Sequence, residues 1–310
     1  MAPPDIRPFP NVGAEIFDCD LSRLTVGDGD QLEAAFAAFG LLVFRNQIVS
    51  ADDLERFAER WGKTTLDISA SVGDHPGVWF GGDSYSPVPE LGMMVHVPGG
   101  VDVMPDDLAF ASLTDAFETL AGPTARALEG LTGIHRSPTG DEVSHPLVIR
   151  HPVSGKSSIY TNPMSAIGVD GLEEQAALQL LNELFDHCQS EEFVTKVDWQ
   201  PGTVMLWDNR ALWQFDHGGV LRGEAQRVRI AGTKLTPAVR PDKSDPSLVQ
   251  RAGATLAGGI ITAAMSGIAE VLEPERLRQD IEIVSEAPDR EPIDDGLDFG
   301  GLPPARLAPL

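Results

Sequence analysis

The chain has few cysteines and few basic residues, and it has no long run of large apolar side chains. Its two cysteines, Cys19 and Cys188, form no Cys-x-x-Cys pair, which excludes a thiolate zinc cluster and indicates a reducing compartment such as the cytoplasm. Lysine and arginine total 23 against 47 acidic residues. The resulting net charge of −24 argues against nucleic acid and anionic membrane surfaces as partners. The N-terminus shows no basic stretch followed by an apolar one, so we expect no signal peptide.

The longest apolar uncharged stretch, Ala252 to Ala269, has 18 residues and raises the question of a membrane span. It is rich in small residues, which makes it short and weakly apolar for a span. Small residues recur at every fourth position from Ala254 to Ser266, which on a helix gives a flat stripe suited to close helix packing. We therefore expect a C-terminal extension, residues 239–310. It would hold an apolar helix at about 247–272, suited to homo- or hetero-oligomer formation, and an acidic Pro/Gly-rich tail.

Many short strand-like runs, with a few helical segments between them, make up the rest of the chain. Leu41–Phe44, Leu108–Ser112 and Thr203–Leu206 are short apolar runs that predict strands. Such a series predicts an α+β fold in which an antiparallel jelly roll, or double-stranded β-helix, is decorated with helices. We expect this domain to span residues 1–238.

Two helices have predicted starting points. Ser50 with Asp53 three residues later is typical of a capping box, and it predicts a helix from Ala51. Asp170 with Glu173 predicts in the same way the start of a long helix that ends near Cys188.

Several short motifs follow one another along the chain. They are Leu42-Val43-Phe44-Arg45-Asn46-Gln47, Phe57-Ala58-Glu59-Arg60-Trp61-Gly62, His145 to Gly155, and Trp207-Asp208-Asn209-Arg210. In this order they resemble the motifs of the taurine dioxygenase (TauD/TfdA) family, which are non-haem iron enzymes that use 2-oxoglutarate. The resemblance extends over roughly Ile6 to Leu235 and implies the jelly-roll fold.

The resemblance also implies where iron ligands would lie. Family members hold iron with a His-x-Asp pair and a distal His on one face of the metal. The distal His position corresponds to Gln214, and the pair is expected near Trp79, with Gly81 at the His position and Asp83 at the carboxylate. Glycine has no side chain and an amide is a weak ligand, so we predict that the usual metal site is lost. If a metal is bound, Asp83 and His217 are its predicted ligands.

Two further segments correspond to contacts that the family makes with 2-oxoglutarate. Asp107 falls where the family has a threonine that contacts this co-substrate. A carboxylate there repels a dicarboxylate by on the order of 1 to 4 kcal/mol, so we predict that the co-substrate is lost. Arg227-Val228-Arg229-Ile230 is similar to the strand whose arginine anchors the 2-oxoglutarate carboxylate. We expect one of the two arginines to face the barrel interior and to bind a carboxylate.

Three side chains are candidates for acid–base catalysis: Asp83, His96 and His217. His96 follows a predicted strand and either points inward or lies on the outer face. His217 lies three residues after Gln214 and either replaces the missing ligand or is a solvated loop histidine. Asp83 is a general acid or base if it is buried, or else a carboxylate that accepts backbone hydrogen bonds.

The remaining candidates are residues for substrate binding. Trp213, Tyr85 and Trp79 either line a pocket or pack in the core, and Asn162 falls where the family keeps an asparagine. The full predicted set is Arg227, Arg229, Gln214, Trp213, Tyr85, Asp107 and Asn162.

Three functional hypotheses follow from these residues. The first is an enzyme without a metal or other cofactor, which carries out lyase, isomerase or cyclase chemistry on a small carboxylate-bearing metabolite in biosynthesis. The second is an Fe(II)- and 2-oxoglutarate-dependent dioxygenase with an unusual ligand set that uses Asp83 and His217. The third is a non-catalytic partner subunit of an active homologue. We favour the first, and metal binding distinguishes the second from the other two.

Overall fold

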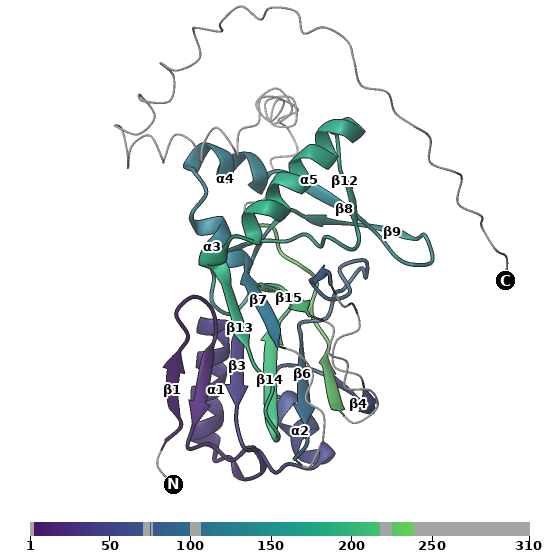
Figure 1. Ribbon diagram of the computed structural model, residues 1–310. Helices are drawn as coiled ribbons and strands as arrows, with labels where there is room; N and C mark the ends of the chain where they lie inside the picture. The colour runs from purple at the N-terminus through teal and green to yellow at the C-terminus, as the bar shows by residue number, and fades with distance from the viewer. Residues whose placement is uncertain (1–2, 71–74, 76, 100–106, 218–224, 239–310) are drawn as a thin grey trace, which may run out of the picture. The chain divides into compact units, whose positions relative to one another are not determined.

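The computed structural model describes residues 3–70, 75, 77–99, 107–217 and 225–238 (Figure 1). The predicted helix at about 247–272 and the predicted acidic tail lie outside the described residues. Among the helices that are described, none is long and apolar enough to cross a membrane.

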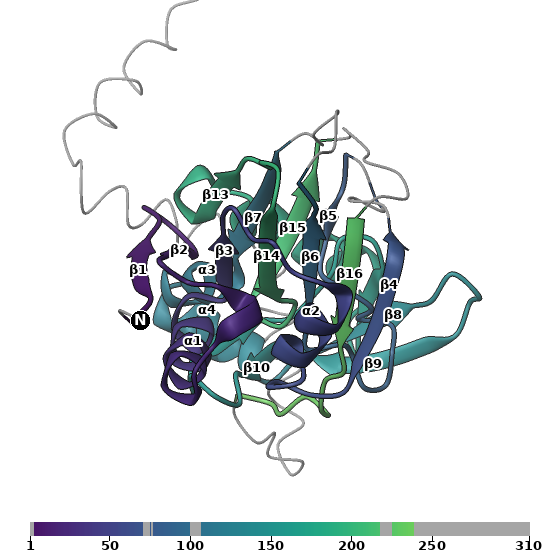
Figure 2. The same cartoon turned by 90° about the horizontal axis from the view of Figure 1, so that it is seen from below.

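The larger sheet has seven strands in the order β1-β2-β3-β14-β6-β16-β4, which can be followed in Figure 2. Their bounds are β1 (Asp5–Pro8), β2 (Ala14–Phe17), β3 (Leu41–Phe44), β14 (Thr203–Asp208), β6 (Gly92–Val97), β16 (Ala225–Ile230) and β4 (Thr64–Ala70). Neighbouring strands are antiparallel except β2 and β3, which run parallel. The predicted strand at Leu41–Phe44 is confirmed with its bounds.

The smaller sheet has the order β13-β7-β15-β5, and two further ladders lie outside it. Its strands are β13 (Val194–Val197), β7 (Leu108–Ser112), β15 (Leu212–Asp216) and β5 (Trp79–Phe80). The other ladders are β12 (Ala166–Val169), β8 (Thr132–Arg136) and β9 (Glu142–Pro146), and the hairpin of β10 (Val148–Arg150) with β11 (Ser157–Ile159).

The helices are α1 (Val26–Phe39), α2 (Ala51–Ala58), α3 (Leu113–Glu118), α4 (Gly122–Glu129) and α5 (Glu174–Cys188), with 3-10 turns η1 (Leu21–Arg23) and η2 (Glu191–Phe193). The predicted capping box of α2 is confirmed, because Ser50 and Asp53 bond to each other's backbone N–H groups. The predicted start of α5 is wrong. Glu173 precedes the helix without a side-chain cap, because the chain still turns at Gly171, where φ is +77°.

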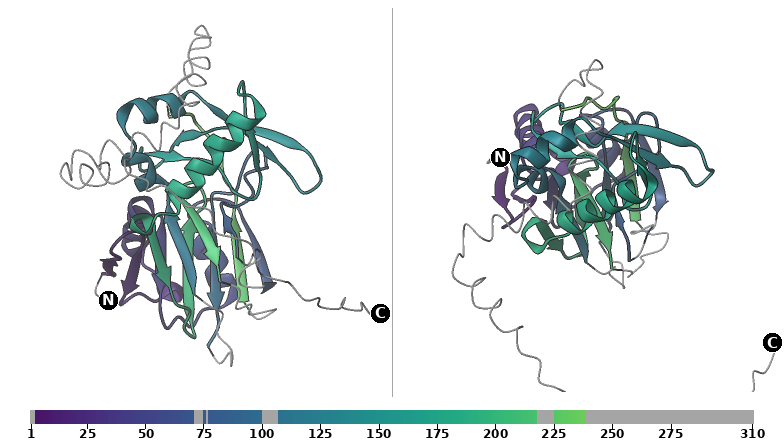
Figure 3. Two further views of the ribbon diagram at one scale, coloured as in Figure 1. Left: turned by 45° about the horizontal axis from the view of Figure 1, so that its top comes forward. Right: turned by 90° about the horizontal axis from the view of Figure 1, so that it is seen from above.

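Three apolar clusters separate these elements into layers. The inter-sheet cluster joins residues of the larger sheet, such as Val95 and Met205, to residues of the smaller sheet, such as Phe110 and Leu212. A helix-side cluster covers the other face of the larger sheet with α1 and α2 (Figure 2). A third cluster covers the outer face of the smaller sheet with α3 and α5, and α5 also packs on β12 (Figure 3). The result is an α+β fold with two facing sheets.

Candidate active site

The inward face of β15 carries Gln214. Leu212, two residues earlier, belongs to the inter-sheet cluster, so Gln214 points to the same side because side chains alternate along a strand. Trp213 lies between them and belongs to the cluster on the outer face. Gln214 therefore faces the space between the two sheets, and Trp213 faces away from it.

Phe80 is the side chain of β5 that faces Gln214. These two residues lie directly opposite each other in the β15–β5 ladder, so their side chains share a face. Gly81 has the opposite orientation, because a Cβ atom added there would lie 2.9 Å from Cδ1 of Trp213. The orientation of Gly81 is therefore not compatible with the predicted place of this residue in the site, and Phe80 is the residue of β5 that faces Gln214.

Gly82 lies two residues after Phe80. A His-x-Asp pattern that began at Phe80 would therefore end at Gly82 and not at Asp83. Gly82 has a φ of +69°, and a Cβ atom there would lie 2.6 Å from Nδ2 of Asn209. A carboxylate-bearing residue does not fit at this position without displacing Asn209.

Both arginines of β16 lie on the inward face. Val228, between them, packs in the helix-side cluster. Arg227 lies opposite Val95 and Arg229 opposite Met93, and both of these partners belong to the inter-sheet cluster. The expectation that one arginine faces inward is corrected to two, because residues i and i+2 of a strand share a face. Arg227 is half-buried and Arg229 is exposed.

A cluster of carboxylates lies beside Arg229. Nε of Arg229 is 3.6 Å from Oε1 of Glu90, and the backbone N–H of Glu90 donates a hydrogen bond of 2.7 Å to Oδ1 of Asp83. Burial and the Asp83 charge raise the pKa of Glu90 to about 7, against the attraction of Arg229. Burial also raises the pKa of Asp83, while hydrogen bonds and Arg229 oppose the shift. Burial is the main cause that raises the pKa of Tyr85, with Asp83 and Glu90 adding to it.

Replacing Glu90 by Gln should stabilise the protein more at pH 8 than at pH 5. The folded-state pKa of about 7 exceeds the ordinary 4.5, so the native state keeps a proton that the unfolded chain releases. The contribution of the Glu90 carboxyl group to stability is therefore complete below pH 4.5 and is lost as the pH rises through 7. Thermal unfolding of both proteins should show a gain in Tm of a few degrees at pH 8 and little at pH 5. An equal gain at both pH values would contradict the raised pKa.

His96 lies outside this site. It shares its face of β6 with Met94, which belongs to the helix-side cluster, while its neighbours Val95 and Val97 enter the inter-sheet cluster. Its Nδ1 lies 3.0 Å from Oε1 of Gln226, and burial lowers its pKa. The predicted catalytic role of His96 is therefore not compatible with its position, because its ring and the arginines lie on opposite faces of the sheet.

His217 follows β15 and is exposed. Its ring packs on Phe215 at a centroid distance of 4.8 Å, and Phe215 in turn contacts Trp79 at 5.3 Å. Phe215 lies one residue after Gln214 and so belongs to the other face of β15. The structure therefore does not bring His217 and Gln214 together on one face, and Trp79 takes part in outer-face packing.

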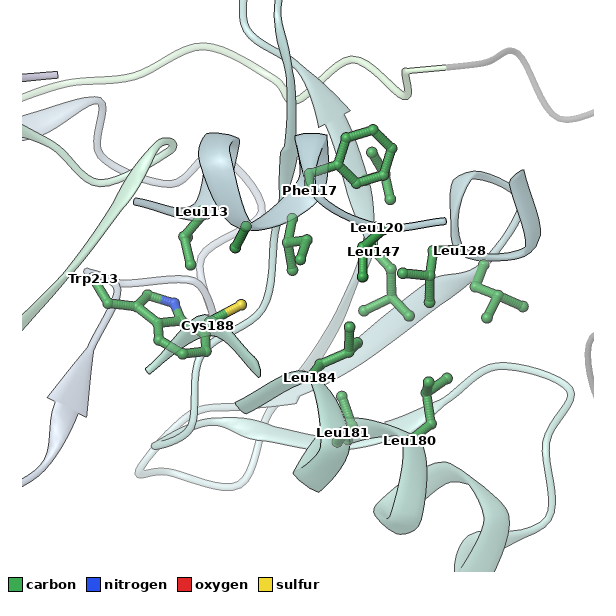
Figure 4. Close-up of a cluster of buried hydrophobic side chains, with 14 of the residues drawn as sticks. Leu113, Phe117, Leu120, Leu128, Leu147, Leu180, Leu181, Leu184, Cys188 and Trp213 are labelled. Atoms are coloured by element: carbon green, nitrogen blue, oxygen red, sulfur yellow. The ribbon is translucent and has the colours of Figure 1, made fainter. Parts of the chain in front are cut away.

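The other predicted substrate contacts occupy different surroundings. Trp213 is fully buried beside Leu113 and Cys188, and its indole N–H donates to the carbonyl of Thr161 at 2.8 Å (Figure 4). Trp213 is thus a core residue and not a pocket residue. Asp107 is exposed just before β7.

Asn162 is buried and lines a cavity of about 280 Å³. Its Nδ2 donates to the carbonyl of Gly82 at 3.0 Å and to the hydroxyl of Ser84 at 2.9 Å. Phe80 and Tyr85 also line this cavity. Asn162 therefore supports the segment that follows β5 and presents one side to a space large enough for a small molecule.

The Trp-Asp-Asn-Arg motif builds a buried ionic network. Asp208 accepts hydrogen bonds from Arg210 at 2.9 and 3.1 Å, and its Oδ2 lies 2.8 Å from Nε2 of His151. Nδ1 of His151 accepts from the N–H of Ser154, so Nε2 carries the proton given to Asp208. Burial alone would raise the pKa of Asp208, but Arg210 and His151 hold it at about 2. These residues connect β14 to the loop after β10 and have a structural role.

The segments that build this site also match a known protein family. The family model "Taurine catabolism dioxygenase TauD, TfdA family" matches residues 5–96 and 106–213. These ranges include β5, Asp83, the Trp-Asp-Asn-Arg motif and the first residues of β15. The chain belongs to the TauD/TfdA family. The predicted family is thereby confirmed.

Two relatives of this TauD/TfdA member are named as alpha-ketoglutarate-dependent dioxygenases. Alpha-ketoglutarate-dependent dioxygenase cnsP of Penicillium expansum is 25% identical over 247 residues, which cover 65% of this chain and 67% of that protein. Alpha-ketoglutarate-dependent sulfonate dioxygenase of Saccharomyces cerevisiae is 29% identical over 280 residues, covering 75% of this chain and 66% of that protein. The matches therefore span about two thirds of the length of these relatives.

Solved structures share the fold. A taurine dioxygenase from Burkholderia xenovorans superposes with a TM-score of 0.69 at 22% identity, covering 80% of this chain and 98% of that chain. AAD-2 in complex with Mn(II) and N-oxalylglycine gives a TM-score of 0.67 at 23% identity, with 76% and 100% covered. These superpositions establish a common fold.

Two predictions are wrong in view of the relatives. The chain was expected to be a metal-independent lyase, isomerase or cyclase without a cofactor, whereas its relatives are named alpha-ketoglutarate-dependent dioxygenases. These names point to 2-oxoglutarate, which is alpha-ketoglutarate, as the co-substrate of the relatives. The prediction rested on residue types at three positions, and one of them, Gly81, does not face the site at all.

The side chains around Gln214 do not match the ligand set expected for iron in this family. Phe80 and Gly82 offer no donor, and the Gln214 amide is a weak one. Within the described ranges, no group of three or more His, Cys, Asp or Glu side chains is arranged to hold a metal ion. The family's three-ligand site therefore does not fit the described residues.

Proposed function

We propose that the chain is a 2-oxoglutarate-dependent dioxygenase that acts on a small organic anion. The observation that carries this proposal is the family match, which spans both β5 and the Trp-Asp-Asn-Arg motif. The names of the sulfonate dioxygenase and of the (S)-phenoxypropionate/alpha-ketoglutarate-dioxygenase of Sphingobium herbicidovorans support a sulfonate or carboxylate as the substrate. We also propose that the two facing sheets form the jelly roll of this family.

The arginines of β16 supply the carboxylate-binding part of this proposal. Arg227 and Arg229 both face the space between the sheets, next to Val95 and Met93. A guanidinium binds a carboxylate through two parallel N–H groups, which fixes the orientation of the bound acid. Asp67 lies opposite Arg227 on β4, so Arg229 at the exposed end is the easier of the two for an incoming acid to reach.

The cavity lined by Phe80, Tyr85 and Asn162 suits the apolar body of a substrate. The described residues do not form the ligand set expected for iron, so no step at iron is assigned to them. What the chain's own residues do in this proposal is bind and orient the two acids.

Turnover tests the proposal. The full chain would be incubated in air with Fe(II), 2-oxoglutarate and either taurine or a phenoxy acid, and the consumption of 2-oxoglutarate would be measured against the same mixture without protein. We expect protein-dependent consumption, and binding of 2-oxoglutarate measured by calorimetry. If the chain neither binds nor consumes 2-oxoglutarate, the proposal is wrong.

Replacing Arg229 by Ala should weaken 2-oxoglutarate binding by at least about tenfold, because a carboxylate loses its charged partner. Arg227→Ala should do the same if its guanidinium also reaches the ligand. Replacing the exposed Arg23, which lies in η1, is the control and should leave the Kd unchanged. An unchanged Kd in both β16 variants would exclude this strand as the carboxylate site.

A further inference from the structure

The backbone of Glu90 is held in place next to the end of β16. The N–H of Leu91 donates to the carbonyl of Ile230 at 2.9 Å, and the N–H of Asn209 donates to the carbonyl of Leu91 at 2.9 Å. On the other side, the N–H of Glu90 donates to Asp83 at 2.7 Å. The position of the Glu90 side chain is therefore set by the fold, and only its rotamer is free to change.

The carboxylate of Glu90 forms an ion pair with the guanidinium of Arg229. Oε1 of Glu90 is 3.6 Å from Nε of Arg229, with the Glu90 side chain 21% exposed and that of Arg229 51% exposed. The pair is formed on the Nε side of the guanidinium, which is one of the two sides at which a carboxylate can bind in the bidentate manner. An incoming acid that binds on this side needs the same N–H group that faces Glu90.

The charges around Arg229 do not favour the ionised form of both Asp83 and Glu90. Asp83 and Glu90 lie together beside Arg229, and Arg227 also acts on Glu90. Burial is the largest cause that raises the pKa of Glu90, and the Asp83 charge is the second. The negative charge of Glu90 is therefore poorly compensated, so a third carboxylate arriving at Arg229 meets repulsion from two that are already present.

We infer that Glu90 is a specificity-determining residue, whose carboxylate competes with the distal carboxylate of 2-oxoglutarate for Arg229. The inference rests on the proposed function and adds a residue that opposes binding of the dicarboxylate. It follows that the chain binds 2-oxoglutarate more weakly than its arginines alone would allow, and that a 2-oxo acid without a second carboxylate is not affected by Glu90.

Calorimetric titration of the full chain at pH 8 tests this inference. The ligands are 2-oxoglutarate and pyruvate, which keeps the 2-oxo acid group and lacks the distal carboxylate. The proteins are the wild type, Glu90→Gln, Arg229→Gln and the double variant. Glu33→Gln is the matched control, because it removes one carboxylate that pairs with an arginine, Arg60 at 2.7 Å, on the helix-side face.

We expect Glu90→Gln to bind 2-oxoglutarate about tenfold more tightly than the wild type. Pyruvate binding should not change, and Glu33→Gln should behave as the wild type. In the Arg229→Gln background the gain should disappear, which a purely structural role of Glu90 does not predict. An unchanged or weaker Kd in Glu90→Gln, or an equal gain with pyruvate, overturns the inference while leaving the proposed function in place. If neither the wild type nor Glu90→Gln binds 2-oxoglutarate, the proposed function fails and the inference fails with it.

Discussion

Replacement of Asp208 by Ala should lower the free energy of unfolding by about 3 to 5 kcal/mol, measured by urea denaturation at pH 7. Asp208 is 1% exposed and is the partner of both Arg210 and His151. Its removal leaves the buried guanidinium of Arg210 without a counter-charge, and this is far more costly than losing an exposed pair. Glu142→Ala is the control, because it breaks an exposed pair with Arg136 and should cost less than about 1 kcal/mol.

A second variant keeps this prediction testable if Asp208→Ala does not fold. The double replacement of Asp208 by Asn and Arg210 by Met removes both charges and should recover part of the lost stability. Acid unfolding gives an independent measurement. The folded-state pKa of Asp208, about 2, lies below the ordinary 3.8, so its contribution is complete above pH 3.8 and is lost as the pH falls through 2. An equal loss in the free energy of unfolding for Asp208→Ala and Glu142→Ala would show that the buried network contributes no more stability than an exposed ion pair.

Local signals in the sequence were sufficient for several elements. The strands at Leu41–Phe44 and Leu108–Ser112 were predicted with their bounds, because turn-forming residues or a helix border these short apolar runs. The start of α2 was predicted from Ser50 and Asp53, because a capping box involves only residues within one helical turn. The motif-based family assignment succeeded because its motifs are short and continuous in the sequence, as in Trp207-Asp208-Asn209-Arg210.

The direction of side chains in buried strands was not predictable in the same way. All residues of β6 are buried, so no alternation of polar and apolar residues indicates which face His96 takes. β5 has only two residues, and its register against β15 is set by pairing with a segment far along the chain. A one-residue slip moves every side chain to the other face, so the sequence did not show that Phe80 and not Gly81 faces Gln214.

Glu90 was missed because a single glutamate in a loop carries no signal of its own. Its importance arises from the approach of Asp83 and of Arg229, which lies 139 residues further along the chain. Only tertiary structure brings these charges together. The arginines were recognised because the strand that holds them is similar to a family motif, whereas the carboxylate that opposes them is in no motif we identified.

Placing histidines at both Phe80 and Gln214 should create a divalent metal site, raising the affinity for Co(II) about a hundredfold over the wild type. The two positions are directly opposite each other on neighbouring strands and share the inward face, so the two imidazoles can approach one ion. Phe80 is half-buried, and histidine is smaller, so the replacement fits the available space. Titration followed by the visible absorbance of Co(II) measures the affinity.

The matched control is the pair Gly81→His with Gln214→His, which follows the register expected from the sequence. A Cβ atom at position 81 lies 2.9 Å from Cδ1 of Trp213, a ring that is fully buried and held by its bond to Thr161. This variant should lose about 1 to 3 kcal/mol of stability through overpacking and should gain no metal affinity, because its histidines point to opposite faces. Tight Co(II) binding by the control, and none by the first pair, would show that Gly81 and not Phe80 faces the site, and the assignment of the inward face of β5 would have to be reversed.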